Sequence, residues 1–121
     1  MQGAVLITWG SPTKGREAKS LESFGKAVEY YSELAKEGRI HGHREYFCIT
    51  GPAYRAGFLI IDGEIDELQK IMVEDRNLRL LTEARAVVDD IDVTLCAGGS
   101  DQSVSETVSR FTETLATLGY M

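Results

Sequence analysis

The sequence predicts an α+β fold, a β-α-β-β-α-β plait whose antiparallel sheet has the strand order 4-1-3-2 and which is followed by a C-terminal helix. Three observations support this prediction. Four short runs of β-type residues are bounded by turn signals, two segments between them repeat apolar residues with helical spacing, and a third helical pattern follows the last run. At 121 residues the chain has the length of one domain, residues 1–121, with the plait in residues 1–99 and the helix in residues 100–121.

The four predicted strands are short and end at turn-forming residues. Residues 4–9 give the first strand, and residues 41–50 and 58–61 give the second and third, which are separated by the turn signal Gly51-Pro52. In residues 91–97 apolar side chains alternate with polar ones, and this period of two predicts a half-buried fourth strand.

Helical periodicity predicts the segments that connect the strands. Residues 15–38 form the first helix, and its predicted buried stripe is Leu21, Phe24, Val28, Tyr31 and Ala35. Residues 66–88 form the second, although the apolar phase slips near Glu74-Asp75 and therefore predicts a break there.

The C-terminal helix follows Gly98-Gly99, and Ser103 and Glu106 have the spacing of a capping box at its start. Its apolar residues recur at spacings of four and three: Val104, Val108, Phe111, Leu115 and Leu118. Threonines and valines give this segment a modest helix propensity, so its apolar stripe must pack against something to hold the helix.

Both faces of the predicted sheet carry apolar residues. The first strand has Leu6 on one side and Val5 and Ile7 on the other, and the third strand repeats this arrangement with Ile60. Because both helices of a plait cover the same face, the second face needs another cover. The C-terminal helix and a second copy of the chain both fit this requirement and do not exclude each other, and we predict a homodimer.

Composition excludes several classes of function. The 13 basic and 19 acidic residues give a net charge of -6, which repels nucleic acid. The apolar runs are far shorter than the roughly 20 residues that cross a bilayer, and the N-terminus lacks a secretion signal, so we expect a cytoplasmic protein without a membrane partner. We expect Cys48 and Cys96 to be buried free thiols on opposite edge strands, too far apart for a disulfide.

The order of elements, together with the segments Thr8-Trp9-Gly10-Ser11-Pro12, Gly15-Arg16-Glu17 and Glu37-Gly38-Arg39-Ile40, resembles an uncharacterised branch of the dimeric α+β barrel superfamily. These are ferredoxin-like subunits that pair sheet to sheet, and they include muconolactone isomerase, the antibiotic-biosynthesis monooxygenases and the YCII-related proteins. The resemblance implies a homodimer that binds a small apolar or aromatic ligand without a cofactor. YCII-related proteins are expected to carry a histidine near the end of the first strand, where this chain has Trp9 and Gly10, so no catalytic residue is carried over.

His41 and His43 are the titratable residues that point most directly to chemistry. Alternate residues of a strand share a face, so the two imidazoles and Glu45 lie on one side of the second strand. They span roughly 13 Å on a straight strand, too far to converge on a metal without a bulge at Gly42. We therefore expect no metal site. Two interpretations stay open: an exposed start of an edge strand, or a ligand-facing pair in which His43 is the candidate catalytic residue for proton transfer.

Trp9 is the aromatic residue best placed for a ligand pocket, because it stands where the first strand meets the following loop. The other aromatic residues that such a pocket could use are Tyr30, Tyr31, Tyr46, Tyr54 and Phe58, although a packed core or dimer interface fits them as well. Arg44 and Arg55 flank the second hairpin and could hold a carboxylate, or they are solvated surface charges.

Two functions follow from these residues. The first is a small-molecule-binding protein or cofactor-free enzyme, of isomerase or monooxygenase type, that acts on a small aromatic or apolar compound. Its candidate ligand-binding residues are Trp9, His41, His43, Arg44 and Tyr46. The alternative is a non-catalytic structural or interaction module, which a tightly filled interior would favour.

Overall fold

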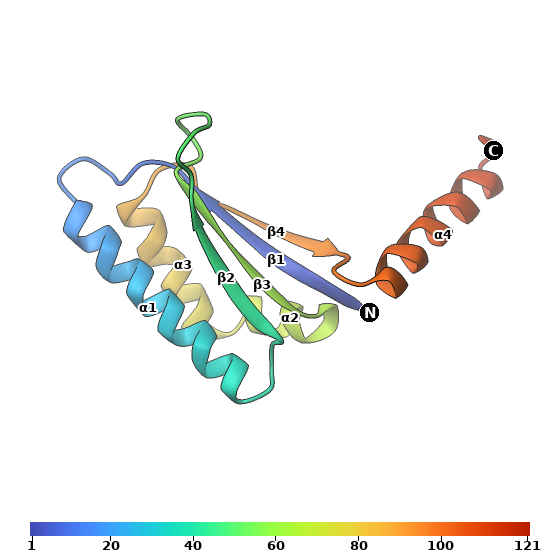
Figure 1. Ribbon diagram of the computed structural model, residues 1–121, viewed down its shortest axis with the longest axis horizontal. Coiled ribbons are helices and arrows are strands. Elements are labelled where there is room, and N and C mark those ends of the chain that lie inside the picture. Colours follow the sequence, from blue (N-terminus) through green and yellow to red (C-terminus); the bar gives the residue numbers. More distant parts are fainter.

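A computed structural model describes residues 1–121 and contains four strands and four helices (Figure 1). In chain order the elements are β1 (Gln2–Trp9), α1 (Glu17–Lys36), β2 (Gly42–Phe47), β3 (Gly57–Glu64), α2 (Ile65–Met72), α3 (Asp75–Val87), β4 (Asp92–Ala97) and α4 (Asp101–Thr117). None of the helices combines the length and the apolar character that a membrane span requires.

The sheet has the order β2-β3-β1-β4, which is the predicted order 4-1-3-2 read from the other edge. All three pairs are antiparallel, and β1 lies between β3 and β4. Leu6 is opposite Ile60 on β3 and Thr94 on β4, and this register places Val5 and Ile7 on the other face of the sheet. The chain therefore has the ferredoxin-like plait that its sequence predicts, with an added C-terminal helix.

The hydrophobic core lies between one sheet face and the helices α1, α2 and α3, which Figure 1 shows together on that side. Val5 and Ile61, at the centre of the sheet, are fully buried, and so are Leu68 and Ile71 of α2. The helix α1 is rotated relative to the predicted stripe. Leu21 is exposed, and the buried residues of α1 are Ser20, Ser23, Tyr30, Tyr31 and Leu34.

The predicted break near Glu74-Asp75 is confirmed, because α2 ends at Met72 and α3 begins at Asp75. Asn77 is fully buried beside this break. Its side-chain nitrogen donates to the Met72 carbonyl at 3.2 Å, and its oxygen accepts a hydrogen bond of 2.6 Å from the Tyr31 hydroxyl. Asn77 thereby satisfies a carbonyl at the end of α2 and ties both helices to α1.

Two predictions for the C-terminal third were wrong. The strand β4 is largely exposed on both faces instead of half-buried, because α1 and α3 cover β2, β3 and β1 but not this edge. The cap of α4 is Ser100, whose hydroxyl accepts from the Ser103 amide at 3.2 Å. Ser103 itself is buried and donates its hydroxyl to the Gln2 carbonyl, which anchors the first turn of α4 to β1.

Candidate functional site: an apolar cavity beneath the sheet

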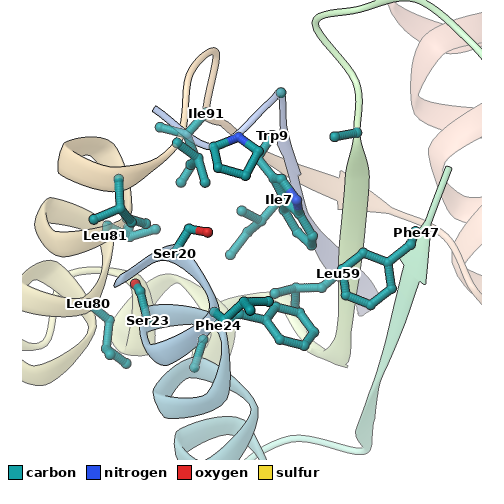
Figure 2. Close-up of a pocket in the computed structure, with 18 of the residues that line it drawn as sticks. Ile7, Trp9, Ser20, Ser23, Phe24, Phe47, Leu59, Leu80, Leu81 and Ile91 are labelled. Atoms are coloured by element: carbon teal, nitrogen blue, oxygen red, sulfur yellow. The ribbon is translucent and has the colours of Figure 1, made fainter. Parts of the chain in front are cut away.

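A cavity of about 190 Å³ opens between the sheet and the helices α1 and α3, at the end of β1 that carries Trp9 (Figure 2). It is lined by 19 residues, of which 15 are hydrophobic. The strands contribute Ile7, Trp9, Phe47 and Leu59 to the wall, and α3 contributes Leu80 and Leu81. An engineered apolar cavity of about 150 Å³ stays dry and binds benzene, so this space suits a small aromatic molecule.

Three aromatic rings form the wall of the cavity next to β2. The centroids of Trp9 and Phe24 are 5.9 Å apart, those of Phe24 and Phe47 are 5.2 Å apart, and those of Trp9 and Phe47 are 6.4 Å apart. Edge contacts between such rings stabilise the cluster beyond the area it buries. Phe47 is 62% exposed, so it stands at the mouth and not in the floor of the cavity.

Gly57 makes room for the Trp9 ring. The two residues are paired across β1 and β3, and a Cβ at position 57 would lie 2.7 Å from Cζ2 of Trp9 and 2.8 Å from the Tyr46 carbonyl oxygen. Real Cβ atoms do not approach other atoms so closely. The absence of a side chain at position 57 therefore fixes where the indole lies.

The cavity wall contains no charged side chain. Its polar side chains are Ser20 and Ser23 on α1, the Trp9 indole and the Tyr31 hydroxyl. The Ser20 hydroxyl donates to the Glu17 carbonyl at 2.6 Å. Burial raises the pKa of the Tyr31 hydroxyl, which stays protonated and donates to Asn77. The site therefore favours uncharged ligands, because an unpaired charge brought into it would lose its hydration without compensation.

His43 lies outside this cavity, at the edge where α1 packs against β2. Its Nε2 is 2.9 Å from the Ser32 hydroxyl oxygen, and its Nδ1 is hydrogen-bonded to a Glu45 carboxylate oxygen. Both ring nitrogens are thus engaged by the chain itself. Ser32 stands inside α1, where the backbone N–H groups are used by the helix, so this Ser-His-Glu chain lacks donors for the oxyanion of an acyl-transfer reaction.

The other predicted site residues are scattered around the sheet. Nε2 of His41 is 3.8 Å from a Glu64 carboxylate oxygen. Arg44 pairs with Asp62 at 3.4 Å on the face opposite the helices, and the Tyr46 ring stacks on Phe58 on that same face with centroids 5.0 Å apart. Of the predicted ligand-binding residues, the structure brings only Trp9 to the cavity. No group of three or more His, Cys, Asp or Glu side chains is arranged to hold a metal ion.

Sequence reasoning missed most of the cavity wall. Phe24 and Leu81 were assigned to helix stripes, and Phe47 to a strand, without a signal that they meet. The serines were passed over because polar residues are expected on the outside of a helix. One signal was available: Ser20, Ser23 and Ala27 are small residues at spacings of three and four, which is a face that leaves space against a neighbouring element.

No protein-family model matches the sequence, and no curated protein matches it closely enough to be called a relative. Solved structures match its fold. A dimeric ferredoxin-like protein of unknown function from Jannaschia sp. CCS1 superimposes with a TM-score of 0.60 at 17% identity, over 78% of this chain and 97% of that one.

Two further structures show the same fold. SnoaB, a cofactor-independent oxygenase from Streptomyces nogalater, matches with a TM-score of 0.57 at 12% identity, over 82% of this chain and 93% of that one. A dimeric ferredoxin-like protein of unknown function from Bacteroides fragilis gives 0.58 at 6% identity, over 78% of this chain and 93% of that one. The chain therefore has the ferredoxin-like α+β fold of these proteins, and the resemblance inferred from its sequence is confirmed at the level of the fold.

Proposed function

We propose that the protein binds a small, uncharged aromatic or apolar molecule in the cavity between the sheet and the helices α1 and α3. The observation that carries the proposal is the cavity itself, about 190 Å³ in volume and enclosed by 15 hydrophobic residues without a charged side chain. Burial of apolar ligand surface drives binding in such a site, and the aromatic rings of Trp9, Phe24 and Phe47 offer faces and edges to a flat ligand.

The cavity weighs against a purely structural module. A filled interior would be expected if the aromatic residues served only to close the core, and native cores contain few voids larger than a water molecule. Here the space lies beside the most aromatic part of the wall, and Phe47 and Leu21 at its edge are both exposed. A ligand in the cavity would cover apolar surface that is otherwise in contact with water.

A cofactor-free enzyme of isomerase or monooxygenase type is the second candidate, and the fold shared with the cofactor-independent oxygenase SnoaB favours it. The wall offers no carboxylate, imidazole or amine for proton transfer, and the Tyr31 hydroxyl is held protonated. Catalysis in this cavity would therefore rest on a substrate that reacts once it is oriented and shielded from water. The wall as it stands supports binding more directly than proton transfer by the protein.

A homodimer is part of the proposal. The face of the sheet opposite the helices carries Leu6, Phe58 and Ile60 in adjacent register, and none of the chain's helices covers it. The matching proteins from Jannaschia sp. CCS1 and Bacteroides fragilis are dimeric. A cytoplasmic location is also proposed, because the free thiols Cys48 and Cys96 suit a reducing compartment.

Trp9 makes the binding proposal directly testable, because it is the chain's single tryptophan and lines the cavity. In a ¹⁵N–¹H correlation spectrum its indole N–H gives one resonance, which we expect to shift saturably as 2-naphthol is added. Naphthalene-2-sulfonate has the same ring system but carries a charge, and we expect it to leave that resonance in place.

Two matched variants on α1 locate the binding. Ala27→Phe fills the cavity from its wall and should abolish the 2-naphthol shift, whereas Ala18→Phe adds the same ring at an exposed position outside the wall and should leave the shift intact. Saturable binding that persists in Ala27→Phe, or a Trp9 resonance that does not respond in the wild type, would contradict the proposal.

A further inference from the structure

The helix α4 exposes its apolar side to solvent. Its apolar residues are at least partly exposed, and Phe111, at the middle of the row, is 64% exposed. The row consists of Val104, Val108, Phe111, Leu115 and Leu118. Beyond its first turn, which Ser103 anchors to Gln2, α4 packs mainly against the end of β4 (Figure 1). A lone helix of this length and of modest propensity is marginal in water, so its apolar row needs a partner.

The open face of the sheet is a second unpartnered apolar surface of the same chain. Leu6, Ile60 and Phe58 lie at its centre, and Ala4 and Thr8 flank Leu6 on β1. The ion pair between Arg44 and Asp62 lies on the β2 side. Figure 1 shows that α4 extends away from the sheet on the side remote from α1 and leaves this face uncovered.

We propose that two copies of the chain pack with their open sheet faces together and that α4 of each copy lies along the partner subunit with its apolar row inward. The inference rests on the homodimer of the proposed function and assigns α4 its role in it. A two-fold contact presents the same two surfaces on both subunits, so one exchange of helices covers both sheet faces and both helix rows.

The area available supports a second copy as the occupant. Four strands spaced about 4.8 Å apart, each about six residues long, give an open face of roughly 400 Å². That is about half of the ~800 Å² that each partner contributes to a standard stable interface. A 17-residue helix about 25 Å long and 10 Å wide adds roughly 250 Å². The sheet face alone is small for a stable dimer, and α4 brings the contact close to the usual size.

A competing arrangement folds α4 back over its own sheet. The connection from β4 passes through Gly98 and Gly99, which have positive φ angles of 144° and 85° and could act as a hinge. That arrangement would cover the open face within one subunit and remove the reason for a dimer. The two arrangements therefore predict opposite links between oligomeric state and the protection of α4.

Sedimentation equilibrium of the full chain tests the exchange. The wild type should be a dimer, and Phe111→Glu should raise its dissociation constant at least about 30-fold, the ratio that corresponds to the loss of a hot-spot side chain. Ile60→Glu on the open face should have an effect of the same size. Thr112→Glu, the neighbouring position on the polar side of α4, is the matched control and should leave the constant within about threefold.

Hydrogen exchange of the α4 amides provides the second measurement. They should be protected in the wild-type dimer and should exchange rapidly in monomeric Ile60→Glu, although that substitution lies on a different element. Phe111→Glu should retain the 2-naphthol response of Trp9, because the cavity lies on the other side of the sheet, and this response shows that the variant is folded.

The outcomes separate the two proposals. A wild-type dimer that Phe111→Glu leaves unchanged overturns the helix exchange alone. A wild-type monomer overturns both the homodimer and the exchange, and protection of α4 in that monomer identifies the folded-back arrangement. Loss of the 2-naphthol response in a wild-type dimer overturns ligand binding and leaves the exchange standing.

Discussion

The Ser32 hydroxyl oxygen on α1 lies 2.9 Å from Nε2 of His43 on the edge strand β2. Glu45 holds the other ring nitrogen, and the His43 side chain is only 14% exposed. Because both nitrogens are bound to the chain and neither points into the cavity wall, the geometry favours a tie between α1 and the edge strand over proton transfer to a ligand.

We expect His43→Gln to lower the free energy of unfolding by about 1 to 2 kcal/mol, because one or both hydrogen bonds are lost in a part-buried setting. The affinity for 2-naphthol should not change. His41→Gln, which removes a half-exposed imidazole two residues earlier, is the matched control and should alter neither quantity. If His43→Gln removed an activity while urea denaturation showed no loss of stability, His43 would belong to the catalytic machinery.

Adjacent tyrosines on α1 should respond oppositely to loss of their hydroxyl groups. Tyr31 donates to buried Asn77 at 2.6 Å, so Tyr31→Phe leaves that amide oxygen unpaired and should cost about 1 to 3 kcal/mol of stability. The buried Tyr30 hydroxyl has no hydrogen-bond partner, so Tyr30→Phe should be neutral or stabilising. Urea denaturation of the two variants checks this contrast, and equal losses would mean that the Tyr31–Asn77 bond has no special weight.

The position of Trp9 should depend on the missing side chain at Gly57. Gly57→Ala brings a methyl group against the indole and the Tyr46 carbonyl, so it should move the Trp9 indole resonance and weaken 2-naphthol binding at least several-fold. Gly42→Ala, at a strand position where an added methyl meets nothing within 4 Å, should do neither. An unchanged Trp9 resonance in a folded Gly57→Ala protein would show that the ring is placed by other contacts.

Arg39 connects the end of α1 to the break between α2 and α3. It donates to Glu67 at 2.7 Å and to both carboxylate oxygens of Glu74. The hydrogen bonds from Arg39 hold the pKa of Glu74 below its ordinary value of about 4.5. A lowered pKa means that the charged pair stabilises the fold above that ordinary value and that this contribution is lost as pH falls through the lowered pKa.

The difference in stability between the wild type and Glu74→Gln should therefore be present at pH 7 and should shrink below about pH 4.5. Its size should be about 1 kcal/mol or less, because both side chains are about one-third exposed and solvent screens the pair. Thermal unfolding followed at pH values from 7 to 3 measures the difference, with Glu113→Gln on α4 as the control. A difference that grew towards acidic pH would contradict the assignment.

The plait could be predicted from the sequence because its signals are local. The alternation of residues around Leu6 and Ile60 indicated apolar character on both faces, and the phase slip near Glu74 located the break between α2 and α3. The rotation of α1 could not be predicted in the same way. Leu21 suited the apolar stripe as well as Ser20 did, and only the packing of α1 against α3 and the sheet places the serine inside.

The candidate site was predicted only in part, because a cavity depends on which elements meet. Trp9 was found from its place at the end of a strand, whereas its neighbours Phe24 and Phe47 come from a helix and another strand, 15 and 38 positions further along the chain. The alternation of His43 and Glu45 correctly placed them on one side of β2. That they face α1 instead of a ligand depends on Ser32, which no local pattern connects to them.

The central claim is that the space beside Trp9, Phe24 and Phe47 takes a small uncharged aromatic molecule. A crystal of the protein soaked with bromobenzene tests it most directly, because the anomalous signal of bromine marks the ligand's position without interpretation of its shape. The account predicts a bromine peak inside the cavity, within contact distance of these three rings. A crystal in which bromobenzene occupies only the open sheet face, or leaves the cavity empty at saturating concentration, would contradict it.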